Sequence, residues 1–164
     1  PSFSVTARSL WALDILVEEG YEYDASVFPI RHDRYGIPAA PLRPFRVTCG
    51  AGSLVEVPGT KVMAGGAPIP VGGGYFRLLP YPISRWMLSR VNSGEKQSGI
   101  VYFHPWEIDT LQPRIKGISG KTRFRHYVNI DRMEKRLTQL MSDFKWGRMD
   151  EVFRSIIPKG VAVA

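Results

Sequence analysis

The stretch GIVYFHPWE, residues 99–107, is the part of the sequence that decides the expected fold. Its run of apolar residues, 100–103, is typical of a buried strand in a parallel sheet, and His104 stands where that strand would end. Further upstream, the pattern predicts a helix over 6–19 followed by a strand over 21–28. Because alternating helices and strands build sheets covered by helices, we expect an α/β fold.

The predicted helix over 6–19 has an apolar stripe at helical spacing. The stripe consists of Leu10, Leu13, Leu16 and Val17. Ser4 and Thr6 are candidate N-caps, because their hydroxyls can accept the first free N–H groups. Gly20 is the expected C-terminal stop.

The rest of the chain predicts loops, short strands and two more helices. Residues 30–45 predict an ordered loop, and residues 53–71 predict short strands around a Pro-Gly turn. A helix is predicted over 80–92, with Ile83, Trp86, Met87 and Arg90 on a common side. After a loop that extends to about Asn129, the last predicted helix covers 131–144, capped by Asp131, with Met133, Leu137, Leu140 and Phe144 facing inward.

The composition is that of an ordinary folded domain. The chain has 164 residues, of which 44% are hydrophobic and 23% charged, and it contains no apolar run long enough for a membrane span. Aromatic residues make up 12%, which argues against intrinsic disorder. The single cysteine, Cys49, excludes an internal disulfide and fits a reducing cytoplasm, the location that we expect.

The positive charge is concentrated in one stretch. The net charge is +7, and residues 112–148 carry all of it, so the remainder of the chain sums to zero. Such a block suggests an electropositive face for nucleic acid, anionic lipid or an acidic polymer. The alternative is a solvated surface without a specific partner. No nucleic-acid-binding motif accompanies the charge, which favours that alternative.

His104 is the first candidate for chemistry. Enzymes with α/β folds place reactive groups where buried strands end, and imidazole exchanges protons near neutral pH. The structural alternative is a histidine that bonds a neighbouring carbonyl. Asp24 ends the other predicted strand and could orient such a histidine, or it could simply bond the backbone of Ser26 in a turn.

Other polar groups give weaker signals. His32, His104 and His126 are far apart and show no metal-site spacing, and we expect His126 at the surface. Glu107 is expected to pair with an arginine. The triple glycine 72–74 lacks the lysine, the spacing and the strand–turn–helix context of a phosphate loop. We interpret it as a place where backbone approaches a ligand closely or turns sharply.

Several segments together resemble the polysaccharide deacetylases with a NodB-like homology domain, specifically the group found with exosortase (PEP-CTERM) exopolysaccharide loci. They follow one another in the family's order and span nearly the whole chain. The matching stretches are 1–4, 23–29, 31–38, 71–81, 102–109, 124–129 and 146–153. Measured against that family, this chain corresponds to the C-terminal part of a longer protein.

The resemblance implies a distorted (β/α) barrel, with its active site at the C-terminal ends of the strands. In this chain, residues 1–30 and 96–110 would supply barrel elements. Residues 31–95 would form a loop-rich insertion with short strands and a helix, and residues 111–164 a basic C-terminal extension.

The resemblance also implies roles for individual residues. The hydrophobic strand ending in His104 matches the motif of the family's general acid, and Asp24 matches the carboxylate that tunes it. The family's base and metal ligands precede Pro1, so a divalent metal, zinc or similar, is expected in the full-length protein and none in this chain. The oxyanion and substrate pocket is expected from Ser2, Phe3, Tyr75, Arg77, Phe103 and Trp106.

The implied reaction is hydrolysis of the acetamide C–N bond of N-acetyl sugars in exopolysaccharide metabolism. The expected partners are such a polysaccharide and the missing N-terminal half, without a membrane span or nucleic acid. We expect the chain alone to be inactive. The alternative is a non-catalytic basic module that binds an acidic polymer through Arg123, Arg125, Arg132 and Arg136, or a carbohydrate through its aromatic residues.

Overall fold

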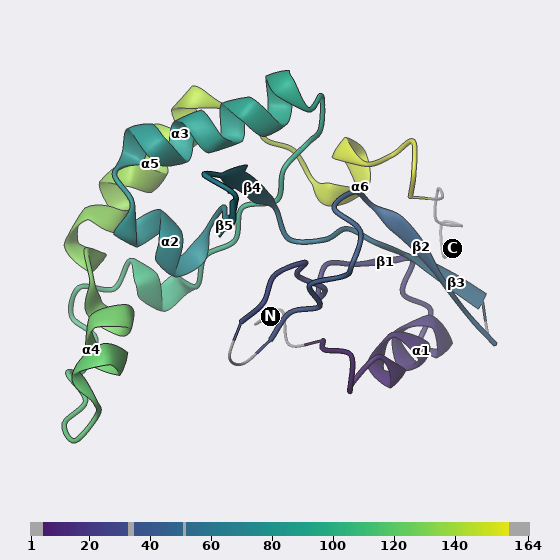
Figure 1. Cartoon of the computed structure of the whole chain (residues 1–164), viewed down its shortest axis with the longest axis horizontal. Helices are drawn as coiled ribbons and strands as arrows, with labels where there is room; N and C mark the ends of the chain where they lie inside the picture. Colours follow the sequence, from purple (N-terminus) through teal and green to yellow (C-terminus); the bar gives the residue numbers. More distant parts are fainter. Residues whose placement is uncertain (1–4, 33–34, 51, 158–164) are drawn as a thin grey trace, which may run out of the picture. The chain divides into compact units, whose positions relative to one another are not determined.

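The structure is a computed structural model that describes residues 5–32, 35–50 and 52–157. The chain forms two compact units (Figure 1), here called unit 1 (Pro1–Pro68 and Gly147–Ala164) and unit 2 (Ile69–Trp146). Both α-helices and small sheets are present, so the predicted mixed α/β class is correct. The described residues form no closed barrel, and the expected (β/α) barrel is therefore not confirmed.

Unit 1 is built on a three-stranded sheet in the order β1-β3-β2. Strand β1 (Tyr23–Asp24) runs parallel to β3 (Gly52–Glu56), and β2 (Phe45–Cys49) runs antiparallel to β3. The predicted strand over 21–28 is thus only two residues long. It ends because the next N–H groups, of Ser26 and Val27, bond to carboxylates instead of to a neighbouring strand. Strand β2 was not predicted.

Helix α1 (Trp11–Glu18) begins later than predicted. Thr6 instead forms a turn, in which its N–H donates to the Ser9 hydroxyl at 2.9 Å. Ser4 lies outside the described residues. The predicted stop is correct, because Gly20 has a φ of +80° and closes the helix in the left-handed conformation.

The core of unit 1 includes a cluster of the buried residues Val5, Leu13 and Val27. Leu13 comes from the predicted apolar stripe of α1, whereas Leu10 of that stripe is 47% exposed. Helix α6 (Met149–Val152), which was not predicted, also belongs to unit 1. The two-stranded sheet of β4 (Lys61–Ala64) and β5 (Ala67–Pro70) follows the predicted β region, and the boundary between the units falls within β5, after Pro68.

Unit 2 is mainly helical. Helix α3 (Tyr81–Ser89) continues into a π-helical turn, η1 (Arg90–Gly94), and lies beside α5 (Met133–Asp143) (Figure 1). The other elements are α2 (Gly73–Leu78), the 3₁₀ turns η2 (Pro105–Glu107) and η3 (Ile130–Arg132), and α4 (Gly120–Tyr127).

Helix α3 buries a different face from the predicted one. The Tyr81 hydroxyl donates to Asp143 Oδ2 of α5 at 2.7 Å, which turns the face of Tyr81 towards that helix. The buried residues are Tyr81, Ser84, Met87 and Leu88. Of the predicted face only Met87 is buried, whereas Ile83 and Trp86 are exposed. In α5 the prediction holds better, because Met133 and Leu140 are buried. The expected cap, Asp131, instead lies within η3.

The predicted buried strand over 100–103 is not present. Tyr102 makes a single parallel bridge, to Gly72, and Phe103 is 43% exposed. The ladder ends after one bridge because the neighbouring segment turns into α2 directly after Gly72. The fold therefore places His104 after an extended segment and not after a central strand.

The triple glycine does lie between a strand and a helix, β5 and α2, contrary to the sequence interpretation. The close approach that the sequence predicts is made to Tyr102 of the same unit. A Cβ atom at Gly72 would lie 2.9 Å from the Tyr102 carbonyl oxygen, and one at Gly73 would lie 2.7 Å from the Tyr102 hydroxyl. Both glycines also have positive φ angles.

Helix α4 occupies part of the predicted loop before Asn129. The hydroxyl of Ser119 accepts the Thr122 N–H at 3.2 Å and caps the helix. None of the residues of α4 is buried. The helix therefore lacks the apolar stripe by which amphipathic helices are predicted from sequence, and the sequence analysis missed it. Within the three described ranges, no helix has both the length and the apolar character that crossing a bilayer requires.

Gly73→Ala should lower the free energy of unfolding by about 1–3 kcal/mol, because the new methyl group meets Tyr102 and the positive φ is unfavourable for alanine. Gly65→Ala is the matched control, since Gly65 has a φ of +59° but no atom within 4 Å of the added Cβ. Urea unfolding followed by circular dichroism measures both variants. Equal losses in the two variants would contradict a role for the Tyr102 contact.

Candidate functional site

The centre of unit 2 is a buried ion pair between Arg77 of α2 and Glu107 of η2. Arg77 Nε lies 2.6 Å from Glu107 Oε2, and each side chain is only 2% exposed. Two charges removed from water to this extent are tolerated only when they compensate each other at close range. The expectation that Glu107 pairs with an arginine is therefore confirmed.

The remaining donors of Arg77 hold the C-terminal end of α4. Its Nη1 donates to the carbonyl oxygens of His126 (2.8 Å) and Val128 (3.1 Å), and its Nη2 donates to that of Arg125 (3.1 Å). The last carbonyls of a helix have no partner within the helix, so the guanidinium supplies the missing donors. These contacts give Arg77 a structural role. Its predicted contact with substrate has not been tested.

The same carboxylate fixes the main chain of His104. Glu107 Oε1 accepts the His104 N–H at 3.1 Å, and the Glu107 N–H donates back to the His104 carbonyl at 2.8 Å. A buried ion pair thus determines where His104 begins the η2 turn. His104 itself is half-buried, so part of it remains in contact with the solvent.

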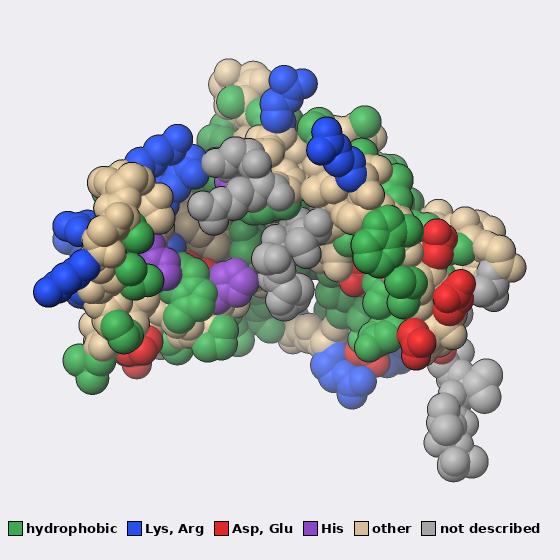
Figure 2. Space-filling view, turned by 90° about the horizontal axis from the view of Figure 1, so that it is seen from below, with side chains coloured by type: hydrophobic (Ala, Val, Ile, Leu, Met, Phe, Trp, Pro, Cys, Tyr) green, Lys and Arg blue, Asp and Glu red, His purple; other side chains and the backbone are tan. Residues whose placement is uncertain are grey.

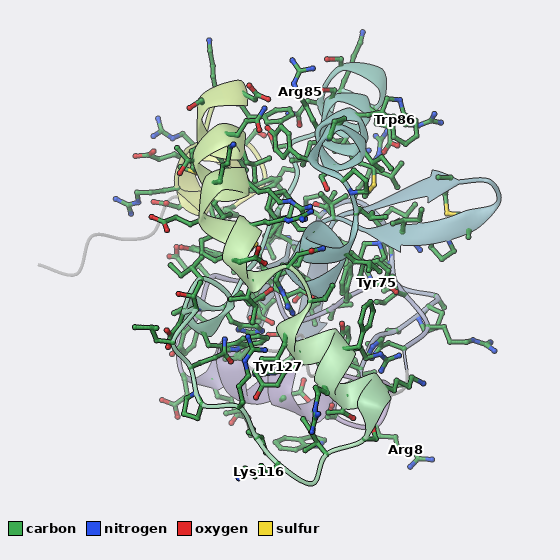
Figure 3. The ribbon with its side chains drawn as sticks, turned by 90° about the vertical axis from the view of Figure 1, so that its left-hand side faces the viewer. Arg8, Tyr75, Arg85, Trp86, Lys116 and Tyr127 are labelled. Carbon is green, nitrogen blue, oxygen red and sulfur yellow. The ribbon has the colours of Figure 1, made fainter. Side chains whose placement is uncertain are left out.

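The imidazole of His104 is the first ring of an aromatic stack. Its centroid lies 5.8 Å from that of Trp106, and Trp106 in turn stacks on His126 at 4.4 Å. Tyr127 contacts His126 edge-on at 4.5 Å. Figure 3 labels Tyr127, the last residue of α4.

His126 is half-buried in this stack and does not lie on the open surface as predicted. Its Nε2 pairs with Gln112 Oε1 at 2.8 Å. Desolvation lowers the pKa of His126, and the nearby charges of Arg77 and Arg114 lower it further. His126 therefore favours the neutral form, which stacks on Trp106 without carrying a buried charge.

The predicted pocket residues do not all behave alike. Tyr75 is 40% exposed, Phe103 43% and Trp106 36%, so each offers part of its ring to the solvent. The ring of Trp106 already stacks on two histidines. Ser2 and Phe3 lie outside the described residues.

Unit 1 contains a second arrangement, a pair of carboxyl groups that end two parallel strands. Asp24 of β1 lies in register with Glu56 of β3. Asp24 accepts both the N–H and the hydroxyl of Ser26, at 3.2 and 2.9 Å, so the turn role considered for Asp24 is confirmed. Asp24 and His104 belong to different units, and their predicted partnership stays a prediction.

Glu56 is fully buried, and the sequence analysis missed it. Its Oε1 accepts the Val27 N–H at 2.9 Å, whereas Oε2 has no hydrogen-bond partner. Desolvation raises its pKa to about 8, and the charge of the neighbouring Asp24 contributes to the rise.

A signal for Glu56 did exist in the sequence. It is the only polar residue in the run Leu54-Val-Glu-Val57, inside a predicted strand. A carboxyl group in such a run is either buried or interrupts the hydrophobic face of the strand. Both cases are unusual for a strand, and this makes the glutamate a candidate for a special role.

The comparisons with known proteins give one match. A family model described as "Domain of unknown function (DUF3473)" matches residues 25–154. No curated protein and no solved structure matches the chain. The matched range begins directly after Asp24. It includes Glu56, the Arg77–Glu107 pair and the complete aromatic stack.

Arg77→Met should lower the free energy of unfolding by about 3–5 kcal/mol, because it leaves Glu107 as an uncompensated buried charge. The double variant Arg77→Met/Glu107→Leu should recover part of that loss. Arg148→Met is the control, since the Arg148–Asp150 pair is 74% and 36% exposed and should contribute less than about 1 kcal/mol. An Arg77→Met variant as stable as the control would contradict the structural role.

Glu56→Gln should remove the part of the pH dependence of the unfolding free energy that comes from Glu56. Because the pKa rises from 4.5 to about 8 on folding, the unfolded state loses this proton first. The contribution of Glu56 is therefore complete below pH 4.5, declines as the pH rises, and is lost above about 8. Urea midpoints across this range should decline less in Glu56→Gln than in the wild type, whereas Glu18→Gln, at an exposed position of α1, should keep the wild-type decline. Equal slopes in all three proteins would show that Glu56 titrates normally.

Proposed function

The chain belongs to the DUF3473 family, and on that premise we propose that it supplies the general acid of a metal-dependent polysaccharide deacetylase. In this reaction water adds to the acetamide carbonyl of an N-acetyl sugar, and the C–N bond then breaks. Protonated His104 donates its proton to the departing amine, and acetate is released. The location in the cytoplasm also stays a prediction.

One observation carries this proposal, the way in which His104 is held. Its main chain is bonded on both sides to Glu107, which is itself fixed by Arg77. Its ring remains half-buried at the edge of the unit. A group that transfers a proton needs a fixed position and access to the reacting atom, and this arrangement supports both.

The resemblance to the deacetylases implies a divalent metal that polarises the carbonyl and activates water. In the described part of the chain, no three His, Cys, Asp or Glu side chains come together as ligands. The contribution assigned to this chain is limited to the proton that His104 provides and to contacts with the sugar.

Exposed aromatic side chains are the proposed sugar contacts. Tyr75 and Phe103 expose ring surface within unit 2, and the apolar C–H faces of a pyranose can pack on such rings. Trp106 has a different proposed role, because its stacking contact orients the ring of His104. Trp106 is thus a positioning residue in this proposal.

The alternative, a basic module for an acidic polymer, loses one of its four predicted arginines. Arg136 donates from Nη1 to the carbonyl oxygens of Phe76 (3.1 Å) and Arg77 (2.5 Å), and burial lowers its pKa. Its charge is therefore used inside unit 2. The exposed part of the basic block is considered below.

His104→Asn should lower kcat for acetate release by about 10²- to 10⁴-fold, the usual contribution of general acid catalysis. The substrates in the assay are N-acetylated chito-oligosaccharides. The enzyme is the full-length protein, expressed from the complete gene. His32→Asn is the control and should keep wild-type activity.

Two results would contradict the proposal. The first is a His104→Asn variant with wild-type kcat. The second is acetate release by the 164-residue chain alone, because the family's base and metal ligands are not among its matched motifs. Retained circular dichroism of each variant excludes loss of folding as the cause of lost activity.

A further inference from the structure

Residues 111–125, here called the 111–125 segment, comprise the loop before α4 and most of that helix. The segment contains five basic residues and no acidic one. The basic residues are Arg114, Lys116, Lys121, Arg123 and Arg125, and all are exposed. All the formal charge that the segment itself contributes is therefore positive.

Large apolar side chains lie among these charges. Leu111 is 91% exposed, Ile115 54% and Phe124 57%. In the part of unit 2 seen in Figure 2, Lys and Arg side chains lie beside hydrophobic ones. Exposed apolar groups that share a surface with basic residues are typical of protein segments that rest on a membrane.

The loop is attached to the helix and forms a defined surface with it. The Tyr127 hydroxyl accepts the Ile115 N–H at 3.0 Å and donates to the Pro113 carbonyl at 2.9 Å. The guanidinium of Arg114 lies 4.3 Å from the centre of the Tyr127 ring. Figure 3 shows Lys116 in the loop and Tyr127 in the helix to which the loop is bonded. These contacts fix basic and apolar side chains next to each other.

Exposed apolar residues alone do not distinguish this segment. On α1, Trp11 is 61% exposed and Ile15 45%, but Asp14 and Glu18 of the same helix are acidic and exposed. Anionic lipids would repel that surface. In the 111–125 segment, charge and apolar side chains both favour the same kind of partner.

We propose that the 111–125 segment docks unit 2 onto an anionic membrane surface, with its basic side chains at the lipid headgroups and Leu111, Ile115 and Phe124 at the boundary of the acyl chains. A soluble acidic polymer would satisfy the charges but offers no apolar phase for these three residues. The contact is peripheral, and it is independent of the proposed deacetylase activity.

Co-sedimentation of the chain with lipid vesicles tests this proposal. Vesicles of phosphatidylcholine mixed with phosphatidylglycerol should bind the chain, and vesicles of phosphatidylcholine alone should not. Each basic residue near such a surface contributes about fivefold to partitioning, so Lys116→Gln/Lys121→Gln/Arg123→Gln should weaken binding about a hundredfold. Leu111→Ser/Phe124→Ser should weaken it more than about tenfold with the charge unchanged.

The matched controls make the same kinds of substitution at exposed positions outside the 111–125 segment. Lys135→Gln, at an exposed position of α5, removes a charge outside the segment, and Trp11→Ser removes an exposed apolar side chain from α1. Both should bind vesicles as the wild type does. All substituted side chains are exposed, and circular dichroism verifies that each variant is folded.

Three results would overturn the proposal. The first is no binding to the phosphatidylglycerol vesicles at low salt. The second is equal binding to both kinds of vesicle, because the charges would then have no effect. The third is unchanged binding of Leu111→Ser/Phe124→Ser together with equally tight binding of the chain to dextran sulfate, which would identify a surface for soluble polyanions.

Discussion

The buried ion pair between Arg77 and Glu107 is the interaction on which the rest of unit 2 depends. Its guanidinium joins α2 to the C-terminal end of α4, and its carboxylate fixes the main chain at the start of η2. Neither partner could stay in this position without the other, because a single buried charge is far more costly than a compensated pair. The position of His104 is therefore a consequence of buried charge compensation.

Each unit contains a buried glutamate, and the two glutamates have different neighbours. Glu107 is paired with an arginine, whereas Glu56 has another carboxyl group, Asp24, as its neighbour and favours the protonated form. In both units, a buried glutamate lies next to a residue that the sequence singles out for chemistry. Glu107 fixes the main chain of His104, and Glu56 shares the edge of the sheet with Asp24.

The basic block of the sequence is divided by the fold into parts with different roles. Arg136 directs its charge to carbonyl oxygens inside unit 2, whereas Lys116, Lys121 and Arg123 remain exposed. Because α4 buries none of its residues, both its charges and Phe124 face the solvent. The same block therefore contributes to internal hydrogen bonding in one place and to the exposed surface in another.

The sequence alone determined the mixed α/β class, the end of α1 at Gly20, the β region before α2 and two of the four predicted inward residues of the last long helix. These features depend on local periodicity and turn chemistry. The sequence also indicated His104 and the pairing of Glu107. Only the tertiary structure decided that residues 100–103 make a single bridge, that α4 exists, that His126 joins a stack and that Glu56 is buried beside Asp24. These features depend on contacts between residues distant in the sequence, and on the cost of burying charge, which no local pattern reports.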